Sequence, residues 1–155
     1  MVIYKIGDLF SSKAPALAQG CNTTGKMGAR IAKTFKNQYI DMYKEYKRLC
    51  GEGIFNAGEG YIYKTDDNRY IFNLATQGIL SGVAIEYVDS SFRWMKGQML
   101  ILGINHVAIP KIGCGLGRLN WENDVLPIIE NIFDQENITV EVWERQYEPK
   151  PQFNL

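Results

Sequence analysis

The stretch that decides the fold covers residues 106–122 and reads HVAIPKIGCGLGRLNWE. It begins with a short apolar run that predicts a buried strand ending at Pro110, because proline has no N–H to give to a neighbouring strand. Three glycines then alternate with other residues, at Gly113, Gly115 and Gly117. Asn120 predicts the N-cap of a following helix. A strand, a glycine-rich loop and a helix N-terminus together bind phosphate in many α/β proteins, because glycines let backbone N–H groups approach an anion.

Alternating glycines also occur in plain strand–helix turns, so this stretch alone supports a structural and a phosphate-binding interpretation about equally. It is not a Walker loop, because no Lys-Ser or Lys-Thr pair follows the last glycine. A dinucleotide-binding Rossmann loop is expected in the first βαβ unit, far upstream of this position. The rest of the chain has to decide between the two interpretations.

The composition predicts one globular domain. The chain has 155 residues, of which 46% are hydrophobic and 22% charged. Lys plus Arg equals Asp plus Glu at 17 each, so no net field attracts a phosphate backbone or an anionic surface, and neither a nucleic acid nor a membrane is the expected partner. The three cysteines lack metal-type spacing and predict free thiols. We expect no metal and no cofactor. We also expect a cytoplasmic location, because neither a signal peptide nor a membrane-spanning run is visible.

Hydrophobic patterning predicts strands that alternate with helices. The expected strands cover residues 2–6, 16–21, 61–63, 70–74, 107–109 and 138–143. The expected helices cover about 28–36, 40–49, 85–102 and 121–133, and Pro127 should kink the last helix or move its start later. This order predicts an α/β fold with a mixed sheet layered between helices. Residues 144–155 contain two prolines and few apolar side chains, which predicts an irregular C-terminal tail after a domain over 1–143.

Four strand exits carry polar or glycine-rich segments, at Asp8 and at residues 20–26, 75–77 and 111–117. The segment over 20–30 reads GCNTTGKMGAR and is another glycine-rich connection between a strand and a helix, earlier in the chain than that over 113–117. Ligands of such sheets bind beyond the carboxyl ends of the strands, so these exits can converge on one crevice. This expected convergence favours the phosphate-binding interpretation.

With these segments in place, the chain resembles the macro domain, the α/β/α fold that binds ADP-ribose. The segments GDLF (7–10), 22–32, IPKIGCGL (109–116) and RLNWEN (118–123) resemble the terminal ADP-ribose protein glycohydrolase branch. The segment NLATQ (73–77) is more similar to phage and bacterial macro proteins described as ADP-ribose 1''-phosphate phosphatases. The resemblance extends from residue 2 to about 143 and implies a three-layer macro domain with a mixed central sheet.

The resemblance also implies a role for each segment. Asp8 would accept a hydrogen bond from the adenine amine, although an isolated Asp more commonly caps a turn. The loop over 22–28 would surround the distal ribose, and the backbone of 112–117 would wrap the diphosphate. The implied ligand-binding residues are Asp8, Leu9, Gly20, Asn22, Gly25, Met27, Gly28, Ile31, Thr76, Lys111, Ile112, Gly113, Cys114, Gly115, Leu116 and Gly117.

Two positions depart from the glycohydrolase pattern. That branch has a lysine where this chain has Gln77, and an aspartate where it has Gly117. Glutamine cannot form a Schiff base, and glycine cannot act as a general acid or base. Deacylation of ADP-ribosylated glutamate by the lysine-plus-aspartate route is therefore not expected.

The remaining reactive side chains favour structural roles. His106 begins a strand on the far side from the glycine-rich loop, so a catalytic triad is not expected. Cys114 lies near a helix N-terminus that could lower its thiol pKa, but a small residue filling a tight turn is the favoured interpretation. Lys26 either meets a phosphate or points into solvent, and Trp121 and Trp143 are expected in the core rather than against adenine.

These observations predict a macro domain that hydrolyses a group from the distal ribose, as an ADP-ribose 1''-phosphate phosphatase or an ADP-ribosyl hydrolase. Neutral catalytic residues Asn22, Thr24 and Gln77 would position the water, and turnover would be slow. The implied partners are ADP-ribose or a derivative and, for a hydrolase acting on proteins, ADP-ribosylated protein. The alternatives are a non-catalytic reader or sequestering binder of ADP-ribose-like nucleotides, and an α/β domain without a nucleotide function.

Overall fold

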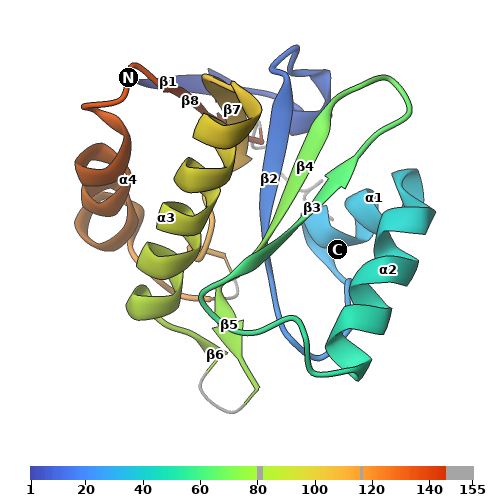
Figure 1. Cartoon of the computed structure of the whole chain (residues 1–155). Coiled ribbons are helices and arrows are strands. Elements are labelled where there is room, and N and C mark those ends of the chain that lie inside the picture. Colours follow the sequence, from blue (N-terminus) through green and yellow to red (C-terminus); the bar gives the residue numbers. More distant parts are fainter. Residues whose placement is uncertain (80–81, 116, 146–155) are drawn as a thin grey trace, which may run out of the picture.

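The protein is described by a computed structural model at residues 1–79, 82–115 and 117–145. One sheet of six strands lies at its centre (Figure 1). The strands are β1 (Val2–Ile6), β2 (Ala16–Cys21), β3 (Gly60–Lys64), β4 (Tyr70–Ala75), β7 (His106–Pro110) and β8 (Thr139–Glu144). Their order across the sheet is β1-β8-β7-β2-β4-β3, and every neighbouring pair is parallel except β3 and β4. The predicted mixed sheet is confirmed.

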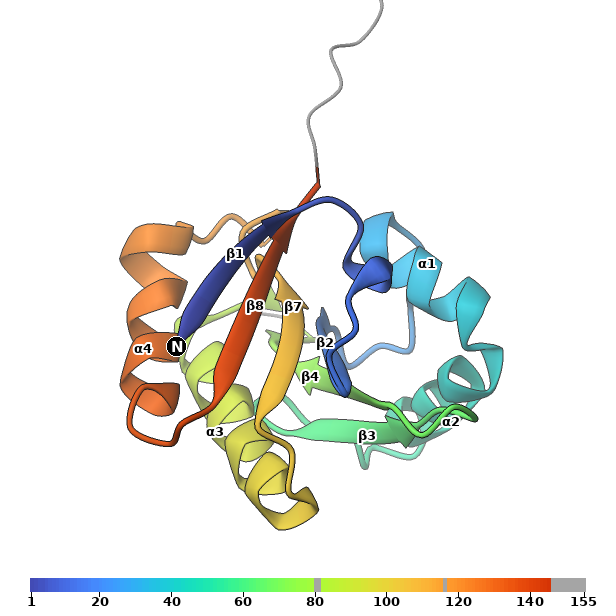
Figure 2. The ribbon, with the colours of Figure 1, turned by 90° about the horizontal axis from the view of Figure 1, so that it is seen from above.

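Helices cover each face of the sheet. They are α1 (Arg30–Gln38), α2 (Ile40–Gly51), α3 (Ile85–Leu102) and α4 (Leu126–Phe133). Viewed along the layers, α1 and α2 lie on one side of the sheet, and α3 and α4 lie on the other (Figure 2). The three-layer α/β/α arrangement predicted from the order of elements is therefore confirmed.

Alternation along the central strands separates two apolar cores. Ala18 and Phe72 pack with the residues of α3 and α4, whereas Leu17, Ile71 and Ala108 pack with those of α1 and α2. All five side chains are at most 1% exposed. Because helices cover both faces, these strands are apolar at consecutive positions rather than alternating with polar residues.

The structure corrects some expected boundaries. Helix α1 begins at Arg30 rather than Gly28, because the preceding Ala29 is extended, with φ −143° and ψ 154°. A short 3₁₀ helix, η1 (Leu9–Ser11), follows β1. The patterning missed a hairpin of β5 (Gln77–Gly78) and β6 (Gly82–Val83), because strands of two residues are too short to show alternation.

Pro127 moves the start of the last helix, which was one of the two expected outcomes. A turn of π-helix, η2 (Trp121–Val125), comes first, and Pro127 lies in the first turn of α4, where its missing N–H costs nothing. At the C-terminus, Glu144 still belongs to β8, and residues 146–155 of the expected tail lie outside the described residues. Among residues 1–79, 82–115 and 117–145, no helix has the length and hydrophobicity needed to cross a bilayer.

Candidate functional site

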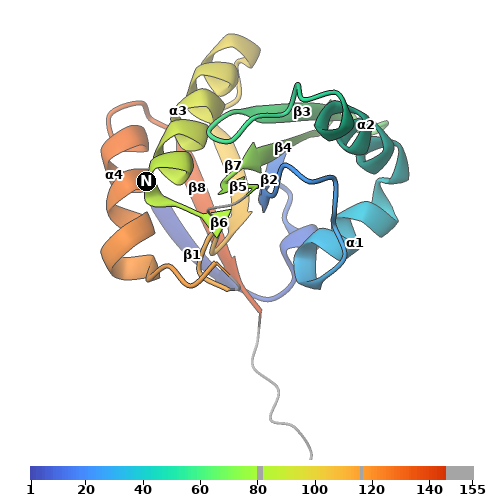
Figure 3. The ribbon, with the colours of Figure 1, turned by 90° about the horizontal axis from the view of Figure 1, so that it is seen from below.

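A cleft of about 580 Å³ opens at the carboxyl ends of β2 and β4. Figure 3 looks onto this end of the sheet and shows the β5–β6 hairpin between α3 and α1. The cleft is lined by residues of the first glycine-rich segment (20–30), the start of α1, the hairpin and the second glycine-rich segment (113–117). They are Gly20, Cys21, Asn22, Lys26, Met27, Gly28, Ala29, Ala32, Gln77, Gly82, Val83 and Gly117. The expected convergence of three of the strand exits is thus observed.

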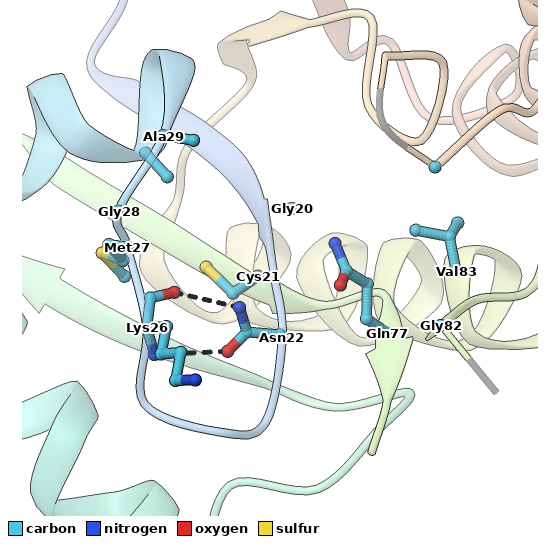
Figure 4. A pocket seen from close by; sticks show the side chains of 12 residues that line it. Gly20, Cys21, Asn22, Lys26, Met27, Gly28, Ala29, Gln77, Gly82 and Val83 are labelled. Atoms are coloured by element: carbon cyan, nitrogen blue, oxygen red, sulfur yellow. Dashed lines mark hydrogen bonds between the residues drawn. The ribbon is translucent and has the colours of Figure 1, made fainter. Parts of the chain in front are cut away.

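The side chain of Asn22 shapes the first glycine-rich segment. Its Oδ1 accepts hydrogen bonds from the backbone N–H of Thr24 at 3.1 Å and from the Thr24 hydroxyl at 2.9 Å. Its Nδ2 donates to the carbonyl of Lys26 at 3.0 Å (Figure 4). The second Nδ2 hydrogen has no acceptor within the described part of the chain, so it is the one that a ligand can use.

Two tyrosines of α2 hold this loop in place by hydrogen bonds from their hydroxyl groups. The buried Tyr46 hydroxyl lies 2.7 Å from Asn22 Oδ1 and 2.8 Å from the Asn22 carbonyl, and Tyr43 donates to the carbonyl of Gly25 at 3.2 Å. Burial, with smaller contributions from Cys21 and Cys50, raises the pKa of Tyr46 far above its ordinary value. The phenol therefore stays protonated and keeps its hydrogen for Asn22. Neither tyrosine was among the site residues expected from the sequence.

Close packing at Gly20 forms the floor of the cleft. A Cβ on Gly20 would lie 2.8 Å from the Thr76 hydroxyl and 3.1 Å from a methyl group of Ile112. Thr76 and Ile112 are themselves only 1% and 3% exposed. These two residues therefore shape the floor from beneath rather than line the cleft.

Gly117 brings the second glycine-rich segment against the hairpin. A Cβ on Gly117 would lie 2.6 Å from the carbonyl oxygen of Gly113 and 2.6 Å from a methyl group of Val83. No side chain fits there without a shift of the backbone, so this conformation of the segment has no room for an aspartate. Gly113 adopts φ +83°, a conformation that favours glycine. Leu116 lies outside the described residues.

The structure brings together some of the expected site residues and not others. Six of them line the cleft: Gly20, Asn22, Met27, Gly28, Gln77 and Gly117. Those that do not are Asp8, Leu9, Thr24, Gly25, Ile31, Thr76, Lys111, Ile112, Gly113, Cys114 and Gly115. The sequence missed Cys21, Ala29, Ala32, Gly82 and Val83, whose small or apolar side chains carry no chemical signal of a site.

Asp8 takes the role that is commoner for an isolated aspartate. Its Oδ1 accepts a hydrogen bond of 2.9 Å from the backbone N–H of Phe10 and so caps η1. The side chain is exposed at the end of β1, and its other oxygen accepts no hydrogen bond among the described residues. The adenine role of Asp8 stays a prediction.

The structure agrees with the favoured structural interpretation of Cys114, because its thiol pKa is raised rather than lowered. Burial raises the pKa of its thiol above the ordinary value, and the nearby Lys111 offsets only part of this rise. A thiol with a raised pKa is a poor nucleophile at neutral pH, because little of it is ionised. The structural interpretation of Cys114 as a small residue in a turn is favoured.

His106 and the two tryptophans are structural, as expected. His106 pairs with Glu141 at the start of β7, away from the cleft. Trp121 is 7% exposed and belongs to the core against α3 and α4, and Trp143 packs against the other core. The structural roles that the sequence predicted for these three residues are therefore observed.

The cleft offers neutral groups for chemistry. Figure 4 shows the Gln77 amide pointing into the space between the first glycine-rich segment and Val83. No carboxylate or imidazole belongs to the lining residues in the described part of the chain, and burial raises the pKa of the Cys21 thiol far above its ordinary value. No cluster of three metal-ligating side chains occurs within those residues either. The lining can bind polar groups and orient a water, and Lys26 is the one cation among the lining residues that the structure describes.

Comparison with protein families decides the classification. A family model described as the Macro domain matches residues 18–128. The chain belongs to the macro domain family. The match includes both glycine-rich segments that border the cleft, and the family agrees with the resemblance found in the sequence.

Named relatives of this macro domain act on ADP-ribose derivatives. ADP-ribose glycohydrolase OARD1 of Homo sapiens is 33% identical over 147 residues, covering 92% of this chain and 90% of the relative. The DNA ADP-ribosyl glycohydrolase of Mycobacterium tuberculosis is 31% identical over 139 residues, covering 87% of this chain and 39% of the relative. An ADP-ribose 1''-phosphate phosphatase of Meyerozyma guilliermondii is 29% identical, covering 77% of this chain and 87% of the relative. The chain thus spans about two fifths of the mycobacterial relative.

A solved structure shows ADP-ribose bound to a similar protein. Thermosipho africanus DarTG in complex with ADP-ribose aligns with a TM-score of 0.77 at 26% identity, covering 97% of this chain and 43% of that chain. The alignment covers nearly the whole of this macro domain. The macro domain fold is therefore shown by structure as well as by sequence.

Proposed function

We propose that this macro domain binds an ADP-ribose derivative in the cleft and hydrolyses the bond that joins a group to the distal ribose. One observation carries the proposal: the Gln77 amide and the free Nδ2 hydrogen of Asn22 border one cleft, between two glycine-rich segments. The names of the relatives support a hydrolase that acts on this ligand class.

Each group has a role that suits its chemistry. The second glycine-rich segment offers backbone N–H groups to the diphosphate, and Asn22 donates to a hydroxyl of the distal ribose. The Gln77 carbonyl accepts a hydrogen bond from the attacking water and orients it. Positioning contributes to the rate without a strong base, so turnover is slow. Thr24 acts through Asn22, because its hydroxyl donates to Asn22 Oδ1 rather than lining the cleft.

An activity assay would identify the group that the protein removes from the ribose. The protein would be incubated separately with ADP-ribose 1''-phosphate, an ADP-ribosylated protein and an ADP-ribosylated DNA oligonucleotide. The balanced net charge predicts no affinity for unmodified nucleic acid, but it does not bear on DNA that carries the ligand itself. Product in excess of one equivalent from any of the three substrates supports the proposal, and its identity names the substrate.

Gln77→Ala tests the mechanism. It should lower kcat about tenfold or more and leave the Kd for ADP-ribose within about threefold, because the amide orients water rather than ligand. Gln38→Ala, which removes an exposed glutamine at the end of α1, is the matched control and should change neither value. An unchanged kcat in Gln77→Ala overturns the assignment of this residue.

A second candidate function is a non-catalytic binder of ADP-ribose-like nucleotides. The lack of a carboxylate or imidazole among the described lining residues favours it. Tight binding of ADP-ribose with no product from the three substrates supports this alternative. Failure to bind ADP-ribose at millimolar concentration overturns both functions.

A further inference from the structure

Arg30 lies where the two glycine-rich segments approach each other. It is the first residue of α1, directly after Ala29, which lines the cleft. Its Nη1 lies 3.5 Å from the position that a Cβ on Gly115 would take, and Gly115 is two residues from Gly117, which lines the cleft from the other side. The Arg30 side chain therefore reaches from the start of α1 to the second glycine-rich segment, along the border of the cleft.

The guanidinium of Arg30 has no partner among the described residues. By contrast, Arg48 pairs with Glu45 and Glu52, and Arg93 pairs with Asp89. Arg69 donates three hydrogen bonds to backbone carbonyls before β2. Arg30 is exposed beside the lining residue Ala29, and a guanidinium with all five donors available is suited to an anion, because phosphate matches its planar fork.

The surroundings of Arg30 strengthen this preference for an anion. The first turn of α1 holds no acidic residue, and Ala29 gives no side-chain hydrogen bond to its N–H groups. The positive end of the helix dipole therefore acts at the same place as the guanidinium. Lys26, the cation that lines the cleft, adds to the positive potential.

We propose that Arg30 binds the diphosphate of the nucleotide ligand, from the side opposite the backbone N–H groups of the second glycine-rich segment. This inference rests on the proposed function and adds a cationic residue to it. The guanidinium neutralises part of the diphosphate charge and makes affinity depend on salt, because an exposed ion pair is screened by ions.

The backbone of Arg30 allows a test that separates binding from folding. Arg30 adopts φ +52°, in the left-handed region that glycine adopts without strain. Arg30→Gly therefore removes the cation and relieves the backbone at once, while glycine adds entropy to the unfolded chain. These two backbone effects oppose each other, so the melting temperature should stay within about 2 °C while affinity falls.

The experiment measures the Kd for ADP-ribose and for adenosine, at low and high salt, in the wild-type chain, Arg30→Gly, Arg30→Lys and the control Lys44→Ala. Arg30→Gly should weaken ADP-ribose binding about tenfold at low salt and flatten its salt dependence. Adenosine binding should not change, because adenosine has no phosphate. Arg30→Lys should recover part of the affinity, and Lys44→Ala, on the exposed face of α2, should bind like the wild type.

Two results overturn the inference while leaving the proposed function intact. One is an ADP-ribose Kd in Arg30→Gly within twofold of the wild type, with the same salt dependence. The other is an equal loss of adenosine and ADP-ribose affinity, which would mean that Arg30 acts through the fold. If the wild-type chain itself does not bind ADP-ribose, the proposed function fails, and this inference fails with it.

Discussion

Near the amino ends of β2 and β7, polar side chains bond to one another around Glu141 of β8, whereas at the carboxyl ends they leave hydrogen-bonding groups open to the cleft. Glu141 accepts hydrogen bonds from Ser12 and Trp143, each at 2.8 Å, and it also pairs with His106. At the other end, Gln77 lines the cleft, and it makes no side-chain hydrogen bond within the described residues. Both ends contain polar side chains, but within the described residues only the carboxyl end has hydrogen-bonding groups that the fold leaves unused.

This difference indicates which end of the sheet can bind a ligand. A carboxylate beside an imidazole has the chemistry of a catalytic pair, yet both oxygens of Glu141 accept hydrogen bonds from residues of the fold. The neutral amides at the cleft are weaker chemically, but they are available to a ligand. Changes at the amino end should therefore cost stability without affecting binding, and changes at the carboxyl end should affect binding more.

The largest expected loss of stability is for Glu141→Ala. It leaves Ser12, His106 and Trp143 without their acceptor and should lower the free energy of unfolding by about 3 kcal/mol. Urea denaturation measures this loss, and the Kd for ADP-ribose should stay within twofold. Glu130→Ala, at an exposed site on α4, is the control and should change the free energy by less than about 0.5 kcal/mol. A stable Glu141→Ala variant that no longer binds ADP-ribose would reverse the comparison.

Gly20→Ala comes next. Its Cβ would meet Thr76 and Ile112, so the floor of the cleft must shift, and we expect a loss of about 2 kcal/mol together with weaker ADP-ribose binding. The control is Gly97→Ala in the middle of α3, where a Cβ meets no atom within 4 Å. This control should raise stability by about 0.5–1 kcal/mol because alanine favours helix. Equal effects of the two substitutions would mean that Gly20 is not packed as described.

Tyr46→Phe should have a smaller effect on stability and a clear effect on binding. It removes the donor to Asn22 Oδ1, so we expect a loss of about 1 kcal/mol of stability and an ADP-ribose Kd about fivefold higher. Tyr87→Phe is the matched control, because the Tyr87 hydroxyl makes no hydrogen bond within the described residues. Calorimetric titration of both variants measures the Kd, and an unchanged value in Tyr46→Phe would mean that the loop does not need this support.

The smallest expected effect is a dependence on pH from Glu141. Burial alone would raise its pKa, but the hydrogen bonds from Ser12, Trp143 and His106 outweigh burial and hold the pKa below the ordinary value of 4.5. The native state therefore binds this proton less readily than the unfolded chain. The resulting stability is complete above pH 4.5 and is lost as the pH falls through the lower native pKa. Thermal unfolding between pH 7 and 3 should show a shallower decline in Glu141→Gln than in the wild type.

Much of the fold could be predicted from local patterns. The strand over 16–21 and the helix over 85–102 have the predicted bounds. The helix shows a period of about 3.6 residues, and the strand is a short run of mostly small residues between two loops. The β5–β6 hairpin was not predicted. The start of α1 was placed two residues early, because the residue types of Ala29 and Arg30 do not indicate the backbone conformations that they adopt. Elements held by contacts with distant residues leave little trace in their own sequence.

The sequence by itself determined the layered sheet, the two glycine-rich connections and the absence of the lysine and aspartate at positions 77 and 117. These follow from residue type and spacing along the chain. Only the tertiary structure decided that Asn22 is held by Tyr46, that Gly117 has no room for a side chain beside Val83, and that Arg30 reaches Gly115. The physical reason is that each of these facts joins residues from different elements, and their separation in space is set by the packing of the whole sheet and its helices.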